Sequence, residues 1–270
     1  MVERITPGIT ASQAKVVLFD FDGTVSIIRS GWVKVMVPMM VEFLLELKTG
    51  ESEEQLTAIV EEFVARLTGR QTIYQMIALA EEIEKRGGKP LDPLTYKKIY
   101  LERLHATIHH RIEELENREC PPEKYLVPGA RPLLEYLMER KMKMYLASGT
   151  DQEFMRHEAR LLDVYRYFDG GVYGALDDYK SFSKKILIQR LISSAECRGR
   201  EFLGFGDGYV EIENIKEVGG VAVGVATDEP ACLEVDPWKR KRLVGVGADF
   251  IIPNFLALDE LRAQLFPNGT

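Results

Sequence analysis

The sequence predicts an α/β fold in which an all-helical segment interrupts a doubly wound parallel sheet after its first strand. Residues 15–20 read KVVLFD, a short β-branched run that is typical of a buried strand. From about residue 30 to residue 117 the apolar residues recur with the helical period instead. After residue 119 short apolar runs alternate with helical patterns, which favours right-handed crossovers and a parallel sheet covered on both faces.

The helical segment is expected to contain four helices separated by turns that carry glycine. Ser52 begins the sequence SEEQ, which fits a capping box at the start of the second helix. The segment shows no strand-like alternation, so we place the domain boundaries around it: 1–28 and 119–270 for the α/β core and 29–118 for the insertion. The expected helices cover residues 30–48, 52–68, 72–86 and 93–117.

The part of the chain after the insertion begins with a linker rich in proline and glycine at residues 120–129. Beyond it the strands are expected at 142–147, 171–173, 201–205, 221–226 and 250–252. The helices are expected at 152–162, 183–194, 210–218 and 258–266. This order of elements predicts one open sheet whose strands end at a common edge.

The composition is that of an ordinary globular protein, with 46% hydrophobic and 29% charged residues and a net charge of −7. The densest basic run, residues 239–242, is short and follows Trp238, so we predict a solvated surface there and no nucleic-acid partner. The three cysteines form no CxxC element and are expected to be free thiols in a reducing compartment.

The most apolar stretch, residues 31–47, is the only part of the sequence that invites comparison with a membrane span. It carries Lys34, Pro38, Glu42 and Glu46 at intervals of about one helical turn, which opposes insertion into a bilayer. We therefore expect a buried amphipathic helix and no membrane partner. No secretory signal is evident, and the predicted location is the cytoplasm.

Polar residues follow the predicted strands where ligands usually bind in such sheets. Asp20 and Asp22 follow the first strand, Ser148 and Gly149 follow a later one, and Asp207 follows the strand at 201–205. Close carboxylates repel one another unless a cation lies between them, and hard oxygen ligands suit Mg²⁺. The pattern predicts a Mg²⁺ site at this edge, suited to a phosphorylated substrate.

The two acids of the first turn suggest covalent catalysis. Asp20 is predicted to be the nucleophile that receives a phosphoryl group, and Asp22 the acid and base that serves the leaving group and the attacking water. Gly23 is expected to allow the sharp turn, and Thr24 to fix it by hydrogen bonding. Their order along the chain is Asp20-Phe21-Asp22-Gly23-Thr24.

A second group of residues is predicted to hold the phosphoryl oxygens. Ser148 offers a hydroxyl, and Gly149 offers a backbone N–H where a helix is expected to begin. Lys184 is our choice for the fixed cation because it opens a predicted helix, with Lys180 and Lys185 as alternatives.

These motifs together resemble the haloacid dehalogenase superfamily. The matching segments are Asp20–Thr24, Ser148–Thr150, Lys184 and Gly206–Glu211. The resemblance implies a Rossmannoid core, a C1-type helical cap, and a Mg²⁺ held by the Asp20 side chain, the Asp22 backbone carbonyl and Asp207. Glu211 stands where the family often has a second Asp, so it is expected in the outer shell of the metal.

An acid at position 22 resembles the phosphatases and phosphomutases of that superfamily, whereas the dehalogenase branch lacks one. The leading hypothesis is a hydrolase of a small phosphomonoester, such as a sugar phosphate or a phosphoglycolate-like acid. The alternatives are a phosphomutase of the β-phosphoglucomutase type and a non-catalytic protein that binds a phosphorylated metabolite. The sequence does not predict the oligomeric state.

Residues in the insertion give weaker signals. Arg70 lies in a polar loop and is a candidate contact for a second anionic group of the substrate, and Trp32 is a candidate for the site entrance. His105 and His109 share a helix face, but no third ligand for a metal is evident. The apolar stripe from Met36 to Leu47 is expected to be ordinary core.

Overall fold

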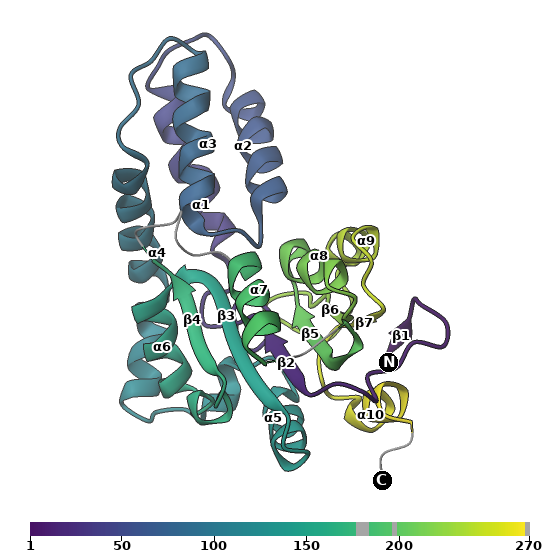
Figure 1. The fold of residues 1–270 in the computed structure, drawn as a ribbon. Helices are drawn as coiled ribbons and strands as arrows, with labels where there is room; N and C mark the ends of the chain where they lie inside the picture. Colours follow the sequence, from purple (N-terminus) through teal and green to yellow (C-terminus); the bar gives the residue numbers. More distant parts are fainter. Residues whose placement is uncertain (177–183, 196–198, 268–270) are drawn as a thin grey trace. The chain divides into compact units, whose positions relative to one another are not determined.

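The computed structural model describes residues 1–176, 184–195 and 199–267, with the backbone alone for residue 184 and residues 191–195. The chain divides into two compact units, which we call the α/β unit (residues 1–30 and 111–270) and the helical unit (residues 31–110) (Figure 1). The helical unit starts at 31 and ends at 110, where the sequence suggested 29 and 118. Arg111 belongs to the α/β unit because its guanidinium donates to the carbonyl oxygens of Ile28 and Ser30, at 2.7 and 2.9 Å.

Four helices account for the insertion, and the chain passes from the helical to the α/β unit within the last of them. Their bounds are α1 Val33–Leu45, α2 Glu53–Leu67, α3 Thr72–Lys85 and α4 Pro93–Glu116. The predicted capping box is present, since Ser52 Oγ accepts from the Gln55 N–H and Gln55 Oε1 accepts from the Ser52 N–H. The apolar stripe of α1 forms core: Met36, Met39, Met40 and Leu44 are at most 1% exposed.

The described residues of the α/β unit form a seven-stranded sheet in the order β1-β7-β6-β5-β2-β3-β4. The short β1 pairs antiparallel with β7, and all other neighbours are parallel, which confirms the predicted fold class. β2 lies between β3 and β5, so the strand that precedes Asp20 is central. The bounds are β1 Glu3–Arg4, β2 Val16–Phe19, β3 Lys143–Asp151, β4 Gly171–Ala175, β5 Phe202–Gly206, β6 Val221–Val225 and β7 Phe250–Ile252.

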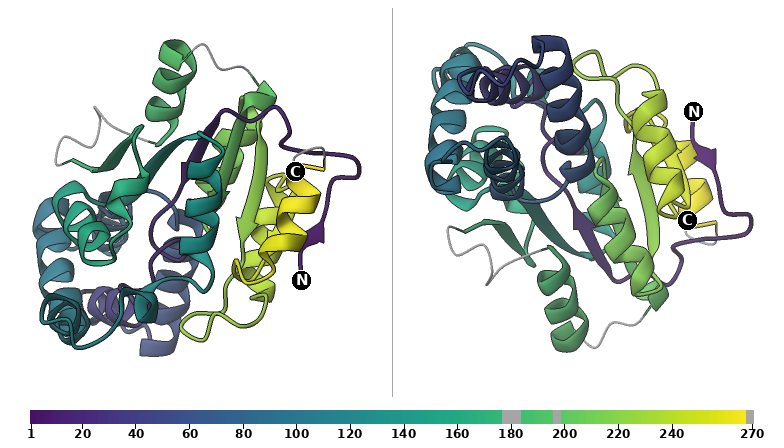
Figure 2. Two further views of the ribbon diagram at one scale, coloured as in Figure 1. Left: turned by 90° about the horizontal axis from the view of Figure 1, so that it is seen from below. Right: turned by 90° about the horizontal axis from the view of Figure 1, so that it is seen from above.

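Helices lie on both faces of this sheet (Figure 2). Their bounds are α5 Ala130–Glu139, α6 Gln152–Leu161, α7 Lys184–Ala195, α8 Tyr209–Glu217, α9 Pro237–Gly245 and α10 Leu258–Leu265. The sequence analysis missed β1, α5 and α9. β1 has only two residues, α5 begins beside the Pro-Gly pair that predicted a linker, and α9 consists largely of charged residues without an apolar period.

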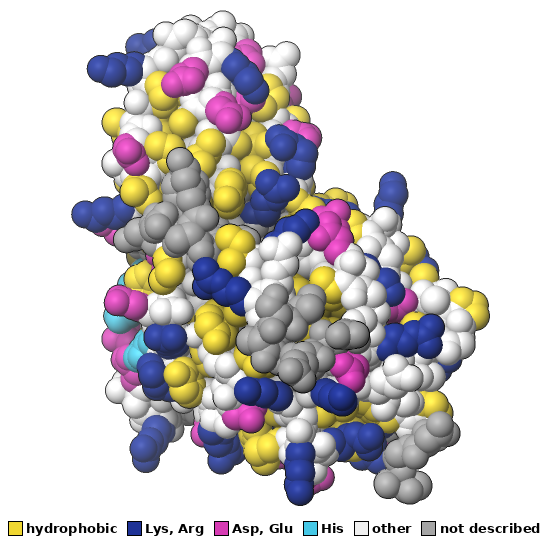
Figure 3. Space-filling model, viewed as in Figure 1, with side chains coloured by type: hydrophobic (Ala, Val, Ile, Leu, Met, Phe, Trp, Pro, Cys, Tyr) yellow, Lys and Arg dark blue, Asp and Glu magenta, His cyan; other side chains and the backbone are white. Residues whose placement is uncertain are grey.

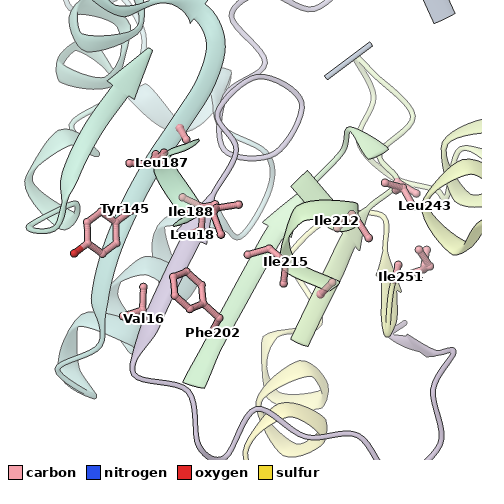
Figure 4. Close-up of a cluster of buried hydrophobic side chains, with 14 residues drawn as sticks. Val16, Leu18, Tyr145, Leu187, Ile188, Phe202, Ile212, Ile215, Leu243 and Ile251 are labelled. Atoms are coloured by element: carbon pink, nitrogen blue, oxygen red, sulfur yellow. The ribbon is translucent and has the colours of Figure 1, made fainter. Parts of the chain in front are cut away.

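Both faces of the central strand are buried, which explains its continuous apolar sequence. Val16 and Leu18 belong to a cluster with Phe202, Ile212 and Ile215 on one face (Figure 4). On the other face the Phe19 ring stacks on the Phe205 ring with centroids 4.7 Å apart. Removing either layer would leave a cavity at the strand that carries the predicted nucleophile.

The surface of the described residues shows no broad basic area on the face drawn in Figure 3, where Lys and Arg side chains are spread among acidic and neutral ones. No helix in the described part of the chain is long and apolar enough to span a bilayer. Cys120 and Cys232 are free thiols, and Cys197 lies outside the described residues.

Candidate active site

The turn after β2 holds the first two predicted acids. The Asp20 N–H donates to the Phe205 carbonyl at 2.9 Å, which extends the pairing of β2 with β5 by one residue, and Asp20 is only 5% exposed. The turn then closes through backbone bonds from the Val25 and Ser26 N–H groups to the Phe21 carbonyl. Asp20 is therefore fixed at the carboxyl end of the central strand, as predicted.

The side chain of Asp22 is held by two hydroxyl groups from the neighbouring strand β3. Ser148 Oγ and Thr150 Oγ1 each donate to Asp22 Oδ2 at 2.9 Å. Asp22 Oδ1 is buried, receives no hydrogen bond from any described residue, and lies 3.9 Å from Arg29 Nε. One oxygen of Asp22 thus accepts two hydrogen bonds, whereas the other lies near the Arg29 guanidinium.

The segment Ser148–Thr150 differs from the prediction. β3 continues to Asp151, which pairs with Ala175 of β4 after a shift in register, and α6 begins only at Gln152. The expected position of Gly149 at a helix N-terminus is therefore wrong, because strand pairing extends further than the apolar run. Ser148 lies in the site as expected, bound to Asp22, and Thr150 is an additional site residue that the sequence analysis did not single out.

Arg29 and Glu158 form a buried ion pair beside Asp22 that the sequence analysis missed. The guanidinium donates to Glu158 Oε1 at 2.6 Å and 3.0 Å, and the two residues are 8% and 2% exposed. Burial raises the pKa of the Glu158 carboxyl, although the charge of Arg29 opposes that rise. The only sequence signal was an arginine directly after the segment VSII at residues 25–28.

Asp207 follows β5, and its side chain packs against the turn that carries Asp22. A Cβ atom added at Gly23 would lie 2.3 Å from Asp207 Oδ2, and Gly23 has a φ of +71°. Gly23 is therefore required both for the left-handed backbone and for the approach of Asp207. This confirms that the first and fourth predicted motifs meet at one edge of the sheet.

Lys239 of α9 lies in this site and corrects the prediction that residues 239–242 form a solvated surface. Its Nζ donates to Asp207 Oδ2 at 2.9 Å and to Glu229 Oε1 at 2.8 Å, and its side chain is only 16% exposed. Burial alone would lower the pKa of Lys239, but the two carboxylates raise it above its usual value, so the lysine is charged. The sequence did not single out Lys239, because it stands in a run of four basic residues and such runs usually lie on the surface.

Two further predictions concern Glu211 and Thr24. Glu211 is 3% exposed in the first turn of α8 and packs over Gly206, where an added Cβ would lie 2.8 Å from the Glu211 Cβ. The prediction that the Thr24 side chain fixes the turn is wrong, because no described residue hydrogen-bonds to its Oγ1 and backbone bonds hold the turn. The outer-shell role of Glu211 stays a prediction.

The candidate phosphate-binding lysines are only partly described. Lys184 is the first residue of α7, but its side chain lies outside the described residues, as does the whole of Lys180. Lys185 pairs with Glu217 at 2.7 Å on the surface, with its side chain 52% exposed. Lys184 therefore stays our prediction for this role.

The candidate substrate contacts from the insertion lie in the helical unit. Arg70 is exposed, with its guanidinium 5.9 Å from the centre of the Tyr74 ring, and Trp32 is partly buried just before α1. The rings of His105 and His109 are 5.2 Å apart on α4. The roles of Arg70 and Trp32 stay predictions.

The predicted metal ligands suit Mg²⁺ by their chemistry. They are two carboxylates, Asp20 and Asp207, and the backbone carbonyl of Asp22, and all three offer hard oxygen atoms. Asp207 touches the turn that carries this carbonyl. No cluster of three or more His, Cys, Asp or Glu side chains suited to a metal occurs among the described residues.

Residues 14–219 match the model of the haloacid dehalogenase-like hydrolases, a span that includes every motif described above. The chain belongs to this family. No curated protein matches it. Its haloacid dehalogenase-like fold explains why the acids gather after β2 and β5.

Solved structures share the fold over nearly the whole chain. A predicted phosphatase from Clostridium acetobutylicum has a TM-score of 0.59 and 16% identity, covering 94% of this chain and 99% of its own. A predicted phosphoglycolate phosphatase from Haemophilus somnus has a TM-score of 0.60 and 14% identity, covering 92% and 98%. A protein from Thermotoga maritima assigned as a β-phosphoglucomutase has a TM-score of 0.52 and 20% identity, covering 92% and 99%. At these identities the likeness shows the fold alone.

Proposed function

We propose that this hydrolase acts on a small phosphomonoester in a Mg²⁺-dependent reaction that passes through an aspartyl phosphate on Asp20. The observation that carries the proposal is the different environment of two acids on one turn. Asp20 is fixed at the strand end, whereas Asp22 has one oxygen bound by Ser148 and Thr150 and the other without a described hydrogen-bond donor. Two carboxyl groups in different environments suit different roles in one reaction.

The first half of the proposed reaction transfers the phosphoryl group to the protein. A carboxylate oxygen of Asp20 attacks the phosphorus, and the bond from phosphorus to the leaving alkoxide breaks. Asp22 acts as the general acid and gives a proton to that alkoxide. The alcohol leaves, and the acyl phosphate stays on Asp20.

The second half releases inorganic phosphate. Water attacks the phosphorus of the aspartyl phosphate while Asp22 accepts a proton from that water. The bond between phosphorus and the Asp20 oxygen breaks, so the carboxylate re-forms and Asp22 is protonated again. In the proposed cycle the Thr150 hydroxyl holds Asp22 in one orientation, and the Ser148 hydroxyl turns from Asp22 to the phosphoryl group when substrate binds.

The proposed Mg²⁺ ligands are the Asp20 carboxylate, the Asp22 carbonyl and Asp207, with Glu211 in the outer shell. When bound, the ion would neutralise charge on the phosphoryl group and on the attacking carboxylate. Ser148, Gly149 and Lys184 are the proposed contacts of the phosphoryl oxygens. The proposed substrates are a sugar phosphate or a phosphoglycolate-like acid, and the cytoplasm stays the predicted location.

The test is phosphate release from a panel of phosphorylated metabolites, with Mg²⁺ and with chelator. We expect turnover that requires the metal and that falls at least about a thousandfold in Asp20→Asn. Asp259→Asn is the matched control, because the Asp259 side chain is 94% exposed. Wild-type turnover by Asp20→Asn would refute the proposal, and a phosphorylated isomer without free phosphate would identify a phosphomutase.

A further inference from the structure

A lysine is embedded between two acids at the edge of the candidate site. Lys239 Nζ lies 2.9 Å from Asp207 Oδ2 and 2.8 Å from Glu229 Oε1, and the three side chains are only 14–17% exposed. The three residues come from the loop after β5, the loop after β6 and helix α9. Glu229 and Lys239 lie outside the four sequence motifs, whereas Asp207 belongs to the fourth.

The segment that supplies Glu229 and Lys239 is held in one conformation. Asp228 Oδ1 accepts from the backbone N–H groups of Leu233 and Glu234, at 2.7 and 2.9 Å. Asp236 Oδ1 accepts from the Lys239 N–H at 2.7 Å and caps the N-terminus of α9. This cap fixes the backbone of the helix turn that carries Lys239.

The charges of this cluster do not balance. One ammonium group faces two carboxyl groups. Asp207 and Glu229 both lie against Gly23, where an added Cβ would be 2.3 Å and 2.9 Å from their nearest oxygen atoms. Two carboxylates packed this closely need a cation nearby, and Lys239 provides it from within the chain.

We propose that Lys239 is the internal counter-cation of the metal site. It holds Asp207 against the turn when no metal is bound, and its positive charge weakens the affinity of Asp207 for a divalent cation. Glu229 shares the lysine and limits this weakening. Lys239 acts through Asp207, so it is a positioning residue. The inference rests on the proposed function only in taking Asp207 as a ligand of Mg²⁺.

A charge series on the full-length protein tests this assignment. Lys239→Met leaves the cluster with two negative charges, and Glu229→Gln leaves it neutral. Lys241→Met is the matched control, because it removes the same charge from an exposed position of the same helix. The measurements are the Kd of Mg²⁺ by titration calorimetry and the Tm in chelator and in Mg²⁺.

We expect Lys239→Met to bind Mg²⁺ at least about tenfold more tightly than the wild type, and Glu229→Gln at least about threefold more weakly. Lys241→Met should match the wild type. Lys239→Met should also have a lower Tm in chelator, and Mg²⁺ should raise its Tm more than it raises that of the wild type.

Equal or weaker Mg²⁺ binding by Lys239→Met would overturn the proposal. If that variant does not fold, Glu229→Gln decides alone, and an affinity equal to that of the wild type would overturn the proposal. Absence of Mg²⁺ binding in every variant would also overturn it. The proposed function is tested separately by phosphate release. A protein that releases no phosphate can still show the predicted order of Mg²⁺ affinities among the variants.

Discussion

The α/β unit and the helical unit treat charged side chains differently. Among the described residues, the α/β unit buries four carboxylates: Asp20, Glu158, Glu211 and Asp249. No described carboxylate between residues 31 and 110 is buried. A buried charge is costly unless it is paired or serves a function. The difference agrees with our proposal that the reaction takes place in the α/β unit. Among the described residues of the helical unit the buried charged side chain is Lys97, which is 5% exposed.

Buried charge in the α/β unit has two distinct uses. Asp249 accepts from Lys216 Nζ at 2.8 and 2.9 Å and from the Ala222 N–H at 2.9 Å, at the start of β6. This pair fixes a strand away from the strand ends where the acids gather. Asp207 and Lys239 form a similar pair at those strand ends, next to Gly23. The two lysine–aspartate pairs therefore differ in position: only the pair of Lys239 and Asp207 lies at the carboxyl ends of the strands, where ligands bind in such sheets.

Asp22→Asn is expected to reduce turnover strongly. This substitution keeps the shape of the side chain but removes proton transfer, so kcat should fall about 10²–10⁴-fold with an unchanged Tm. Asp259→Asn serves as the control at an exposed position. An Asp22→Asn variant with wild-type kcat would show that Asp22 does not act as the general acid and base.

Lys216→Met tests the structural pair. Removing the lysine leaves Asp249, which is fully buried, without its cation, and we expect the free energy of unfolding to fall by about 3 kcal/mol. The affinity for Mg²⁺ should not change. Urea denaturation measures the first quantity and calorimetry the second. A changed Mg²⁺ affinity would contradict the distinction between the two lysine–aspartate pairs.

Two glycines allow the same substitution to be compared in both units. Gly23 and Gly50 have φ values of +71° and +86°, so alanine at either position is strained by about 1–2 kcal/mol. An added Cβ meets nothing within 4 Å at Gly50 but lies against Asp207 at Gly23. Gly50→Ala should lower stability slightly and keep activity, whereas Gly23→Ala should also abolish phosphate release. Equal activity in the two variants would contradict the placement of Asp207.

The smallest effect concerns a surface pair of the helical unit. A hydrogen bond from Arg86 lowers the pKa of Glu51 from 4.5 to about 2. A carboxyl group with a lowered pKa contributes stability above its ordinary pKa and loses it as the pH falls toward the lowered value. The wild type should therefore be more stable than Glu51→Gln at neutral pH. Thermal unfolding should show that this difference shrinks as the pH falls from 4.5 toward 2, and a difference independent of pH would contradict it.

Much of the fold was predictable because periodicity and strand-end residues are local signals. The four helices of the insertion, the central strand and the meeting of Asp207 with the first turn all follow from such signals. The pairing that extends β3 to Asp151 was not predictable, because it depends on β4. Lys239 was missed for a related reason, since its burial depends on Asp207 and Glu229, which are distant in sequence.

The central claim is that Asp20 accepts a phosphoryl group, and the most direct measurement is acid quenching during turnover of p-nitrophenyl phosphate with Mg²⁺, followed by mass spectrometry of peptides. We predict a phosphoryl group on the peptide that contains Asp20, absent from the Asp20→Asn protein, which should also lack turnover. Full turnover by Asp20→Asn, with no phosphoryl group on that peptide in the wild type, would contradict the account.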